Sequence, residues 1–251
     1  VTTITEDDVA FGPENLAIAH DDIDMRIAMS LDAVDMSERR EADPTRMSGG
    51  QQQRVAIAGM LAMNPEILVL DEPTAMLDPQ GRADIMHILD ELQQHGTTII
   101  LVTHHRDEFV NADRIIRLDN GRIVQSARGN TASIPEMDES GTAQEDNPIA
   151  KSNIANGASK PTSAVPIIEI HNLIYQYPNS SKPVLDKLSI TINEGETVAI
   201  TGHNGAGKTT LARLLCALEQ PQSGSITVNT IPVARQRANG NMQSLKRADR
   251  E

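Results

Sequence analysis

The chain has 251 residues, a formal net charge of −13, one cysteine, no tryptophan, and only two tyrosines and two phenylalanines. A single cysteine excludes an intrachain disulfide framework and argues against a zinc site, and an acidic surface repels phosphate backbones, so nucleic acid is not an expected partner. No apolar run approaches the roughly 20 residues that cross a bilayer. We therefore expect a soluble or peripheral protein with an aliphatic, methionine-rich core.

Helical periodicity and breaks define the first elements of the chain. Residues 6–12 carry acids followed by apolar residues, and Gly12-Pro13 is expected to end this segment. Apolar residues recur at helical spacing over residues 23–36, which predicts a short amphipathic helix. A glycine turn at Gly49-Gly50 opens a further helix, and Asn64-Pro65 ends it.

An all-apolar run over residues 67–70 predicts a buried parallel strand. This strand delivers Asp71 and Glu72 to its carboxyl end, where doubly wound sheets bind ligands, and we expect it to lie beside the strand of a phosphate loop. A helix over residues 81–95 and a second apolar strand over 97–103 follow.

Residues 103–125 are expected to complete the first part of the chain. His104-His105 follows the second strand, and residues 109–112 suit a short helix. Residues 114–124 predict two strands joined by a turn at Asp119-Asn120-Gly121.

Residues 126–166 differ in composition from the rest, because they are rich in Ser, Thr, Asn, Gly, Pro and Ala without a periodic apolar pattern. Such a segment is typical of a flexible linker. We therefore expect three parts: residues 1–125, the linker over 126–166, and residues 167–251. In the last part, strands alternate up to residue 200, a helix covers 211–218 and a strand 225–228, and the polar residues 234–251 show no closing element.

Residues 202–209, GHNGAGKT, match the phosphate-binding loop pattern between a predicted strand and a predicted helix. The glycines let backbone N–H groups turn inward around the phosphates, and the helix N-terminus adds partial positive charge. Lys208 would reach the terminal phosphates, and Thr209 would offer its hydroxyl to Mg²⁺. The expected nucleotide-binding residues of this loop are Gly202, Asn204, Gly205, Ala206, Gly207, Lys208, Thr209 and Thr210.

Asp71 and Glu72 have separate expected roles in such a site. Asp71 would contact Mg²⁺ through water, and Glu72 would act as the general base that orients the attacking water. The alternative is an acidic strand end that caps the next helix. Ser48-Gly49-Gly50-Gln51 can bind an anion through the serine hydroxyl and bare backbone N–H groups, although the same residues also make a good helix start.

Taken together, these motifs resemble those of ATP-binding cassette (ABC) ATPases. MSGGQ, ILVLDEPTAMLDP and LVTHH look like the signature motif, the Walker B motif with the D-loop, and the switch histidine; TGHNGAGKTT looks like Walker A. The resemblance implies an α/β fold, the P-loop NTPase fold of the ABC nucleotide-binding domain, with magnesium-dependent ATP hydrolysis. ITEDDVAFGPENL further resembles the cassettes of energy-coupling-factor importers for vitamins and metal ions.

The resemblance also implies roles for individual residues. Tyr177 would stack on adenine, Ser48 and Gly50 would contact the γ-phosphate of a partner cassette, Asp78 would couple the two sites, and His104 would sense the γ-phosphate. For His104 the alternative is a histidine that merely ends a strand, and His105 is expected to be a spectator. Met47 replaces the usual leucine of the signature at similar volume, which should matter little.

The order of the motifs departs from that of the family. Signature, Walker B and switch histidine come first, Walker A follows the linker, and no Q-loop is visible. We expect a window from a fused double-cassette ATPase that joins the end of one cassette to the start of the next. The two halves either close as one circularly permuted cassette, or remain parts of two cassettes in a head-to-tail pair, and Lys208 has different neighbours in the two cases.

The leading functional hypothesis is an ATPase subunit of an importer of the energy-coupling-factor type, bound to a second cassette and to a transmembrane subunit at the cytoplasmic face of the cell membrane. The alternatives are a soluble ABC ATPase outside transport and a truncated nucleotide-binding product without turnover. Because Walker A is separated from its own Walker B, we expect the chain alone to bind ATP weakly and to hydrolyse it slowly or not at all. Cys216, after Walker A, is expected in the core.

Overall fold

The computed structural model describes residues 4–109, 111–128, 165–178, 180–236 and 242–244. The linker expected over residues 126–166 falls mostly on residues 129–164, which lie outside the described residues. We refer to residues 4–128 as the N-terminal part and to residues 165–244 as the C-terminal part.

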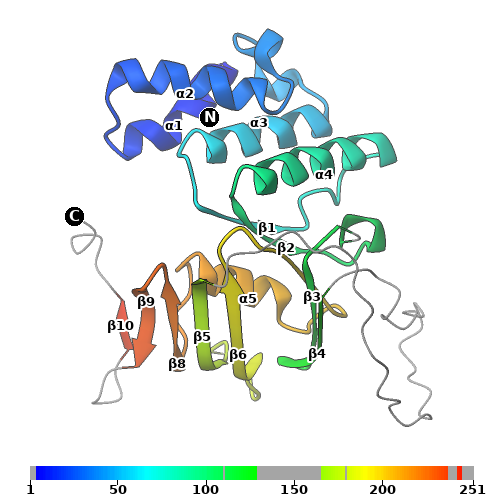
Figure 1. Ribbon diagram of the computed structural model, residues 1–251, viewed down its shortest axis with the longest axis vertical. Coiled ribbons are helices and arrows are strands. Elements are labelled where there is room, and N and C mark those ends of the chain that lie inside the picture. The colour runs from blue at the N-terminus through cyan, green and yellow to red at the C-terminus, as the bar shows by residue number, and fades with distance from the viewer. Residues whose placement is uncertain (1–3, 110, 129–164, 179, 237–241, 245–251) are drawn as a thin grey trace.

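Two sheets form the lower half of the molecule in Figure 1. The first, called here the parallel sheet, has the order β1-β2-β7-β3-β4, with β4 antiparallel to β3 and the other neighbours parallel. Its strands are β1 (Ile67–Asp71), β2 (Thr98–Val102), β7 (Thr197–Thr201), β3 (Arg114–Asp119) and β4 (Arg122–Arg128). The second is antiparallel and has the order β10-β9-β8-β5-β6. Its strands are β5 (Pro166–Tyr175), β6 (Leu185–Asn193), β8 (Ser223–Val228), β9 (Ile231–Gln236) and β10 (Met242–Ser244).

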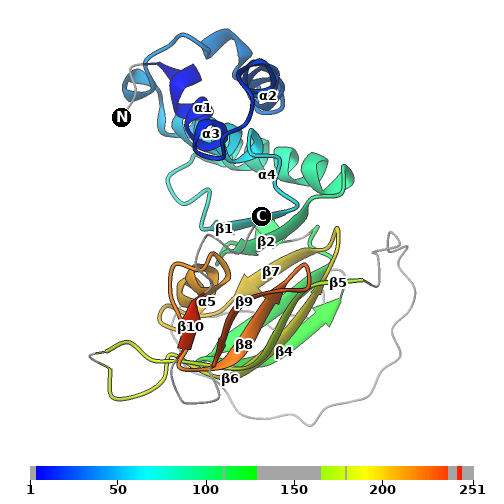
Figure 2. The same ribbon diagram turned by 90° about the vertical axis from the view of Figure 1, so that its left-hand side faces the viewer.

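Helices cover the parallel sheet on both faces. The α-helices are α1 (Thr5–Asn15), α2 (His20–Asp32), α3 (Gly49–Leu61), α4 (Pro79–Gln94) and α5 (Lys208–Leu215), and short 3₁₀ helices are η1 (Ser37–Arg39), η2 (Pro44–Arg46) and η3 (Arg106–Phe109). Figures 1 and 2 show α1 to α4 on one side of the sheet, and α5 on the side of the antiparallel sheet.

The alternation of side chains along β2 explains this layering. Ile99 and Leu101 pack into the cluster that includes the apolar faces of α1 to α4. Ile100 and Val102 pack into the cluster of α5 and the antiparallel sheet. Because β2 is buried at all five positions, it separates two hydrophobic cores.

The two parts of the chain share the parallel sheet. β7 of the C-terminal part pairs with β2 through Ile100↔Val198 and with β3 through Ile115↔Ala199. The closure as one permuted cassette, one of the two arrangements that the sequence leaves open, is therefore the arrangement of this structure. The expectation that β1 lies beside β7 is wrong, because β2 lies between them. β2 is therefore central and buried at every position, whereas β1 lies at the edge of the sheet and is partly exposed.

Local differences from the expected elements have packing causes. α1 continues through Gly12 and Pro13, and a Cβ at Gly12 would lie 2.8 Å from the Met63 side chain, so glycine here permits close helix packing instead of a break. The short helix expected over residues 109–112 lies earlier, as η3. Part of the segment expected to lack a closing element, residues 234–251, forms the end of β9 and β10.

The hairpin expected at Asp119-Asn120-Gly121 is confirmed, with φ of 47° at Asn120 and 74° at Gly121, as a tight turn between β3 and β4 requires. Cys216 differs from its expected place in the core. It is exposed at the C-cap of α5, because Leu211 and Leu214 occupy the buried face of that helix.

Candidate nucleotide-binding site

The carboxyl ends of β1, β2 and β7 lie at one edge of the parallel sheet. Asp71 at the end of β1 is in register with Val102 at the end of β2, and the Thr103 amide donates to the Ile200 carbonyl of β7 at 3.2 Å. The residues that follow these strands therefore leave the sheet side by side. They are the acids after β1, the histidines after β2 and the phosphate-type loop after β7.

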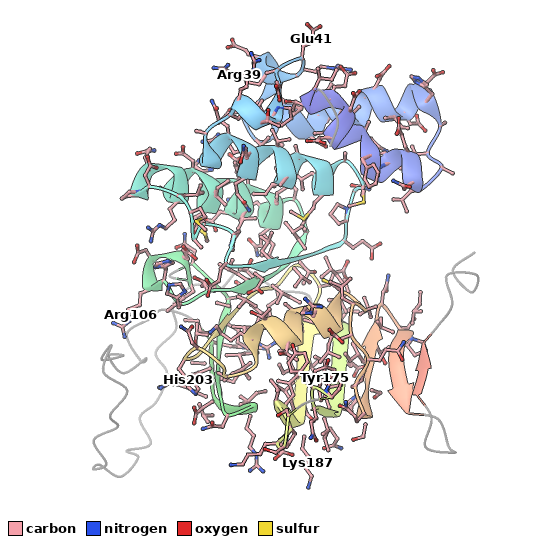
Figure 3. The ribbon with its side chains drawn as sticks, turned by 180° about the vertical axis from the view of Figure 1, so that it is seen from behind. Arg39, Glu41, Arg106, Tyr175, Lys187 and His203 are labelled. Atoms are coloured by element: carbon pink, nitrogen blue, oxygen red, sulfur yellow. The ribbon has the colours of Figure 1, made fainter. Side chains whose placement is uncertain are left out.

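The loop after β7 is folded tightly against β3. Gly202 has a φ of 147°, and a Cβ there would lie 2.3 Å from the Leu118 carbonyl oxygen, so only glycine fits. Gly207 caps α5 with a φ of 101°. His203, whose Nε2 lies 2.8 Å from Asp119 Oδ1, ties the loop to the β3–β4 turn; Figure 3 shows this histidine on the same side of the molecule as Arg106 of η3.

Lys208 is the first residue of α5 and is 6% exposed. Its ammonium donates to the Gly202 carbonyl at 2.8 Å and to the His203 carbonyl at 3.2 Å. The cation thus lies against the loop whose residues His203 to Gly205 are exposed. An ammonium, exposed backbone N–H groups and the N-terminus of a helix form a cradle with the chemistry for a phosphate.

Tyr177 lies next to the start of α5. Its hydroxyl is 3.1 Å from the Thr210 hydroxyl, and its ring stands edge-on to Tyr175 at 5.0 Å. Tyr177 is 36% exposed, whereas Thr210 is buried. The structure thus brings an accessible aromatic ring close to the loop; Thr209, one residue earlier, is exposed.

Glu72 and His104 come together at the sheet edge, with Glu72 Oε1 3.0 Å from His104 Nδ1. Glu72 has a φ of 48°, in the left-handed region, and its amide donates to the Val102 carbonyl at 2.9 Å. The strained backbone turns the Glu72 side chain toward the end of β2. Asp71, the preceding residue, is exposed.

The MSGGQ segment lies away from the loop. Ser48 caps α3: its hydroxyl accepts from the Gln51 amide at 3.3 Å, and the Gln51 side chain accepts from the Ser48 amide at 3.1 Å. Asp78 caps α4 by accepting from the Gly81 amide at 2.7 Å. A Cβ at Gly49 or Gly50 would lie 3.8 Å from Met76 or 3.7 Å from Leu77, so Ser48 to Gln51 and Asp78 are neighbours.

These neighbours and the phosphate-type loop lie on opposite faces of the parallel sheet, because α3 belongs to the helical layer and α5 to the other side (Figure 1). Within the described residues no hydrogen bond joins the two groups. The structure therefore assembles the residues of the loop and of the strand ends, but it does not bring Ser48, Gly49, Gly50 and Gln51 to the loop.

Several polar residues beside the site have no motif in the sequence. Glu108 of η3 is 2% exposed and accepts hydrogen bonds from the hydroxyls of Thr74 and Thr103. His105, expected to be a spectator in the chemistry, has structural contacts: its Nδ1 lies 3.3 Å from Arg82 Nη1 and its ring lies 4.0 Å from the ring of His104. Glu108 is one acid among several in the segment, and its spacing alone does not distinguish it from Asp107.

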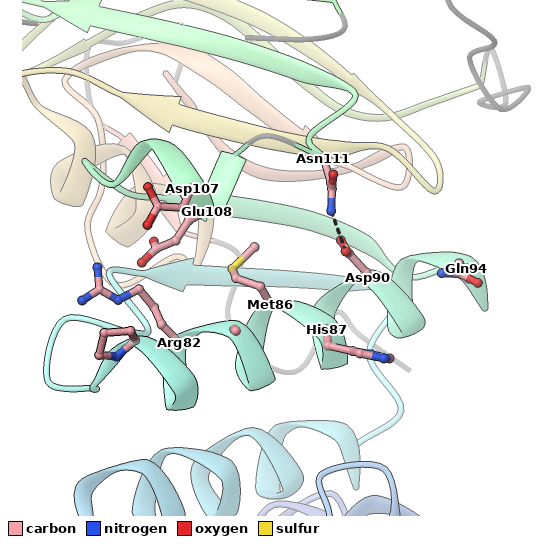
Figure 4. A pocket seen from close by; sticks show the side chains of 10 residues that line it. Arg82, Met86, His87, Asp90, Gln94, Asp107, Glu108 and Asn111 are labelled. Atoms are coloured by element: carbon pink, nitrogen blue, oxygen red, sulfur yellow. Dashed lines mark hydrogen bonds between the residues drawn. The ribbon is translucent and has the colours of Figure 1, made fainter.

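A groove of about 550 Å³ between α4 and η3 adjoins these residues (Figure 4). Arg82, Met86, Asp107 and Glu108 are among the residues that line it.

The donor set fits Mg²⁺ bound together with a phosphate. No group of three or more His, Cys, Asp and Glu side chains suited to a metal occurs within the described part of the chain. Mg²⁺ commonly takes only one or two protein ligands and completes its shell with water and phosphate oxygens. The exposed Asp71 and Thr209 offer oxygens of the kind that such a shell requires.

Curated relatives resemble the chain over part of their length. A putative ABC transporter ATP-binding protein of Bifidobacterium longum is 48% identical over 274 aligned positions, which cover 100% of this chain and 35% of the relative. The energy-coupling factor transporter ATP-binding protein EcfA1 of Clostridium novyi is 55% identical over 125 positions, which cover 49% of this chain and 45% of that protein. The chain thus spans less than half the length of these relatives.

Solved structures resemble it over about half of the chain. The cbiO1 protein from Clostridium perfringens, described as part of the ABC transporter complex cbiONQ, has a TM-score of 0.48 and 36% identity over 51% of this chain and 52% of its own. A dimeric bacterial ABC transporter cassette, MJ0796, has a TM-score of 0.40 and 34% identity over 44% of this chain and 49% of its own.

No helix within the described ranges is long and apolar enough to cross a membrane.

The sequence model of the family described as "ABC transporter" matches residues 2–75 and 185–250, together more than half of the chain. These matched segments contain Ser48 to Gln51, Asp71 and Glu72, and the whole loop from Gly202 to Thr210. The chain therefore belongs to the ABC transporter family.

Proposed function

We propose that the chain binds magnesium-ATP and is part of the ATP-hydrolysing subunit of an importer of the energy-coupling-factor type for a vitamin or metal ion. The carrying observation is the convergence of the phosphate-type loop, Asp71-Glu72 and His104 at one edge of one sheet. The identity of 55% to EcfA1 over 125 positions supports the type of importer.

Different residues near this edge bind different parts of magnesium-ATP. The N–H groups from Gly202 to Thr210, including Asn204, Ala206 and Gly207, hold the phosphates, and Lys208 adds a positive charge. Tyr177 presents its ring to adenine. Asp71 and Thr209 would hold Mg²⁺, which would neutralise charge on the phosphate oxygens.

Glu72 and His104 act where hydrolysis occurs. Glu72 orients the attacking water and takes its proton. A carboxylate within hydrogen-bond reach of that water can act as a general base in this way. His104 senses the γ-phosphate. The contact of 3.0 Å between the two side chains holds them in a common orientation.

A second cassette completes the site. Ser48, Gly49, Gly50 and Gln51 lie on the face of the parallel sheet away from this chain's own loop. This position supports a role in contacting the ATP of a partner arranged head to tail. Asp78, beside them, couples the two sites. A transmembrane subunit recruits the pair to the cytoplasmic face of the membrane as a peripheral subunit.

One observation favours a second candidate, nucleotide binding without turnover. Within this chain the signature-type residues and the loop lie on opposite faces of the sheet, so a single copy does not supply both to one ATP. The two candidates predict the same binding and differ in turnover.

Binding of magnesium-ATP by the purified chain, measured by calorimetry, tests the proposal. Lys208→Gln should weaken binding at least about tenfold, since a charge-assisted contact is lost. Lys187→Gln is the matched control, because Lys187 is an exposed lysine of β6 (Figure 3). Absence of binding, or equal loss in both variants, would contradict a phosphate site at the loop. Turnover that Glu72→Gln abolishes would favour the ATPase over the binding-only candidate.

A further inference from the structure

Glu108 is a buried residue whose carboxyl group accepts hydrogen bonds from neighbouring hydroxyls. The residue is 2% exposed, and burying such a group costs several kcal/mol unless hydrogen bonds compensate, by the usual order of magnitude. Its Oε1 accepts from the Thr74 hydroxyl and its Oε2 from the Thr103 hydroxyl. Both threonines are buried as well, at 1% and 0% exposure.

The two threonines belong to different loops, and each lies close to a residue of the proposed hydrolysis site. Thr74 follows Glu72 by two residues in the segment after β1, and Thr103 directly precedes His104 after β2. Glu108 is therefore a bridge whose two oxygens hold the two loops at a fixed separation.

Glu72 and His104 themselves are held less firmly than this bridge. Their side chains are 35% and 46% exposed, and the contact of 3.0 Å between them faces solvent. An exposed contact of this kind contributes little to its own geometry. The orientation of the pair therefore depends on the groups around it, which include the Glu72 backbone and the buried threonines.

A second set of contacts extends the bridge to α4. The hydroxyl oxygen of Thr103 accepts from the His105 amide at 3.0 Å, and the His105 ring contacts the Arg82 guanidinium. Glu108 and Arg82 line the same groove, as Figure 4 shows. The loop after β2 is thus fixed on both sides of His104.

From this geometry we infer that Glu108 is a positioning residue that sets the contact between Glu72 and His104 through Thr74 and Thr103. The inference rests on the proposed function for its catalytic meaning, but the geometric part holds for the chain without nucleotide. Removal of the bridge releases the two loops, so the carboxylate and the imidazole no longer meet.

The test uses the full chain without nucleotide and reads the ¹⁵N resonance of His104 Nδ1 at alkaline pH. Glu72→Gln calibrates the resonance for a changed contact. Thr74→Val and Thr103→Val each remove one hydroxyl donor at nearly constant shape, and Thr98→Val is the matched control. Thr98 is a buried threonine at the opposite end of β2, where its hydroxyl accepts from the Gly195 amide.

We expect Thr74→Val, Thr103→Val and Glu108→Ala to move the resonance toward its position in Glu72→Gln, whereas Thr98→Val leaves it unchanged. Glu108→Gln should restore most of the wild-type position, because an amide can accept from one threonine and donate to the other. If Glu108→Ala does not fold, the two threonine variants decide. A wild-type resonance in both of them, or no response to Glu72→Gln, would overturn the inference.

Turnover of magnesium-ATP gives a second readout wherever the wild type is active. Thr74→Val should lower kcat by about ten- to a hundredfold, since small displacements of reacting groups have effects of this size, and KM should change by less than about twofold. A rise in KM at constant kcat would contradict positioning. Failure of the wild type to bind ATP would reject the proposed function, while the nucleotide-free resonances would still decide the role of Glu108.

Discussion

The N-terminal and C-terminal parts contribute to the candidate site by different means. The N-terminal part supplies side chains, namely Asp71, Glu72 and His104, whose contacts are exposed at the ends of β1 and β2. The C-terminal part supplies mainly backbone, in a loop where Gly202 and Gly207 have positive φ and close neighbours. In the proposed function, chemistry on the phosphate would thus depend on the N-terminal part, and phosphate binding on the C-terminal part.

The two parts should therefore respond differently to substitution. A side-chain change at the ends of β1 or β2 removes one functional group and leaves the fold in place. A change in the loop, or at the boundary between the parts, alters the backbone on which the whole edge depends.

The largest effect is expected for Glu72→Gln. Loss of the proposed general base should lower turnover by about 10²- to 10⁴-fold, while magnesium-ATP affinity and the free energy of unfolding stay near the wild-type values. Single-turnover kinetics with parallel calorimetry would measure both. A comparable loss of binding would contradict the division of work between the two parts.

Arg114→Leu should cost about 3–5 kcal/mol of stability, because it leaves a buried partner without its counter-ion. Arg114 of β3 pairs with Glu196 before β7; its Nε lies 2.9 Å from Oε1, although this N–H does not point at the oxygen, and Nη2 donates to Oε2 at 3.2 Å. The side chains are only 15% and 3% exposed.

Arg122→Leu is the control for Arg114→Leu. It removes another ion pair between the two parts, to Asp186 at 2.5 Å, but the Arg122 side chain is 68% exposed, so the cost should stay below about 1 kcal/mol. Urea unfolding would measure both variants. Equal costs would show that the boundary between the parts is not buried in solution.

Gly202→Ala should cost about 2–4 kcal/mol and abolish nucleotide binding. The new Cβ would lie 2.3 Å from the Leu118 carbonyl oxygen at a φ of 147°, so both overpacking and backbone strain oppose it. Gly205→Ala is the control: its φ is 85°, but no atom lies within 4 Å of the new Cβ, so only strain of about 1 kcal/mol remains. Similar melting temperatures for the two variants would contradict tight packing of the loop on β3.

The smallest expected effect concerns alkaline pH and Tyr175 in the C-terminal part. Burial, and then the hydrogen bond to Glu219 at 2.9 Å, raise the pKa of Tyr175 to about 12 from an ordinary value of 10.0. The folded state holds the Tyr175 proton more tightly than the unfolded state does. The protonated hydroxyl of Tyr175 therefore makes its full contribution to the free energy of unfolding below about pH 10, and this contribution is lost as the pH rises toward 12. The loss should amount to about 2–3 kcal/mol.

Urea unfolding from pH 8 to pH 12 measures this loss as the difference between the wild type and Tyr175→Phe, which lacks the titrating group. Tyr177→Phe is the control, because Tyr177 is 36% exposed. If the difference in the free energy of unfolding between the wild type and Tyr175→Phe stays constant with pH, the raised pKa of Tyr175 is contradicted.

The sequence predicts local chemistry better than it predicts which strands become neighbours. The phosphate loop, the acids after β1, the histidine after β2 and the β3–β4 turn follow from motif, spacing and turn residues within short segments. The order β1-β2-β7-β3 does not, because a strand of the C-terminal part enters between two strands of the N-terminal part. A local sequence pattern identifies an apolar strand but does not indicate which other strand lies beside it in the sheet.

Tertiary contacts also decide the residues that the sequence interprets wrongly. Gly12 is a packing site for Met63 and not a break, and Cys216 faces solvent because two leucines occupy the buried face of α5. Glu108 is recognisable only once Thr74 and Thr103 are seen on either side of it. Buried polar bridges of this kind are formed by distant residues and have no fixed spacing.

Cross-strand NOEs between β2 and β7 would measure whether the C-terminal part completes the sheet of the N-terminal part within one chain. The labelled chain should be diluted in an excess of unlabelled chain. We predict NOEs between the amides of register partners such as Ile100 and Val198, with the Thr103 amide, which donates to Ile200, protected from exchange. Absence of these NOEs within labelled chains, or a rapidly exchanging Thr103 amide, would contradict the shared sheet and the single edge at which the site is assembled.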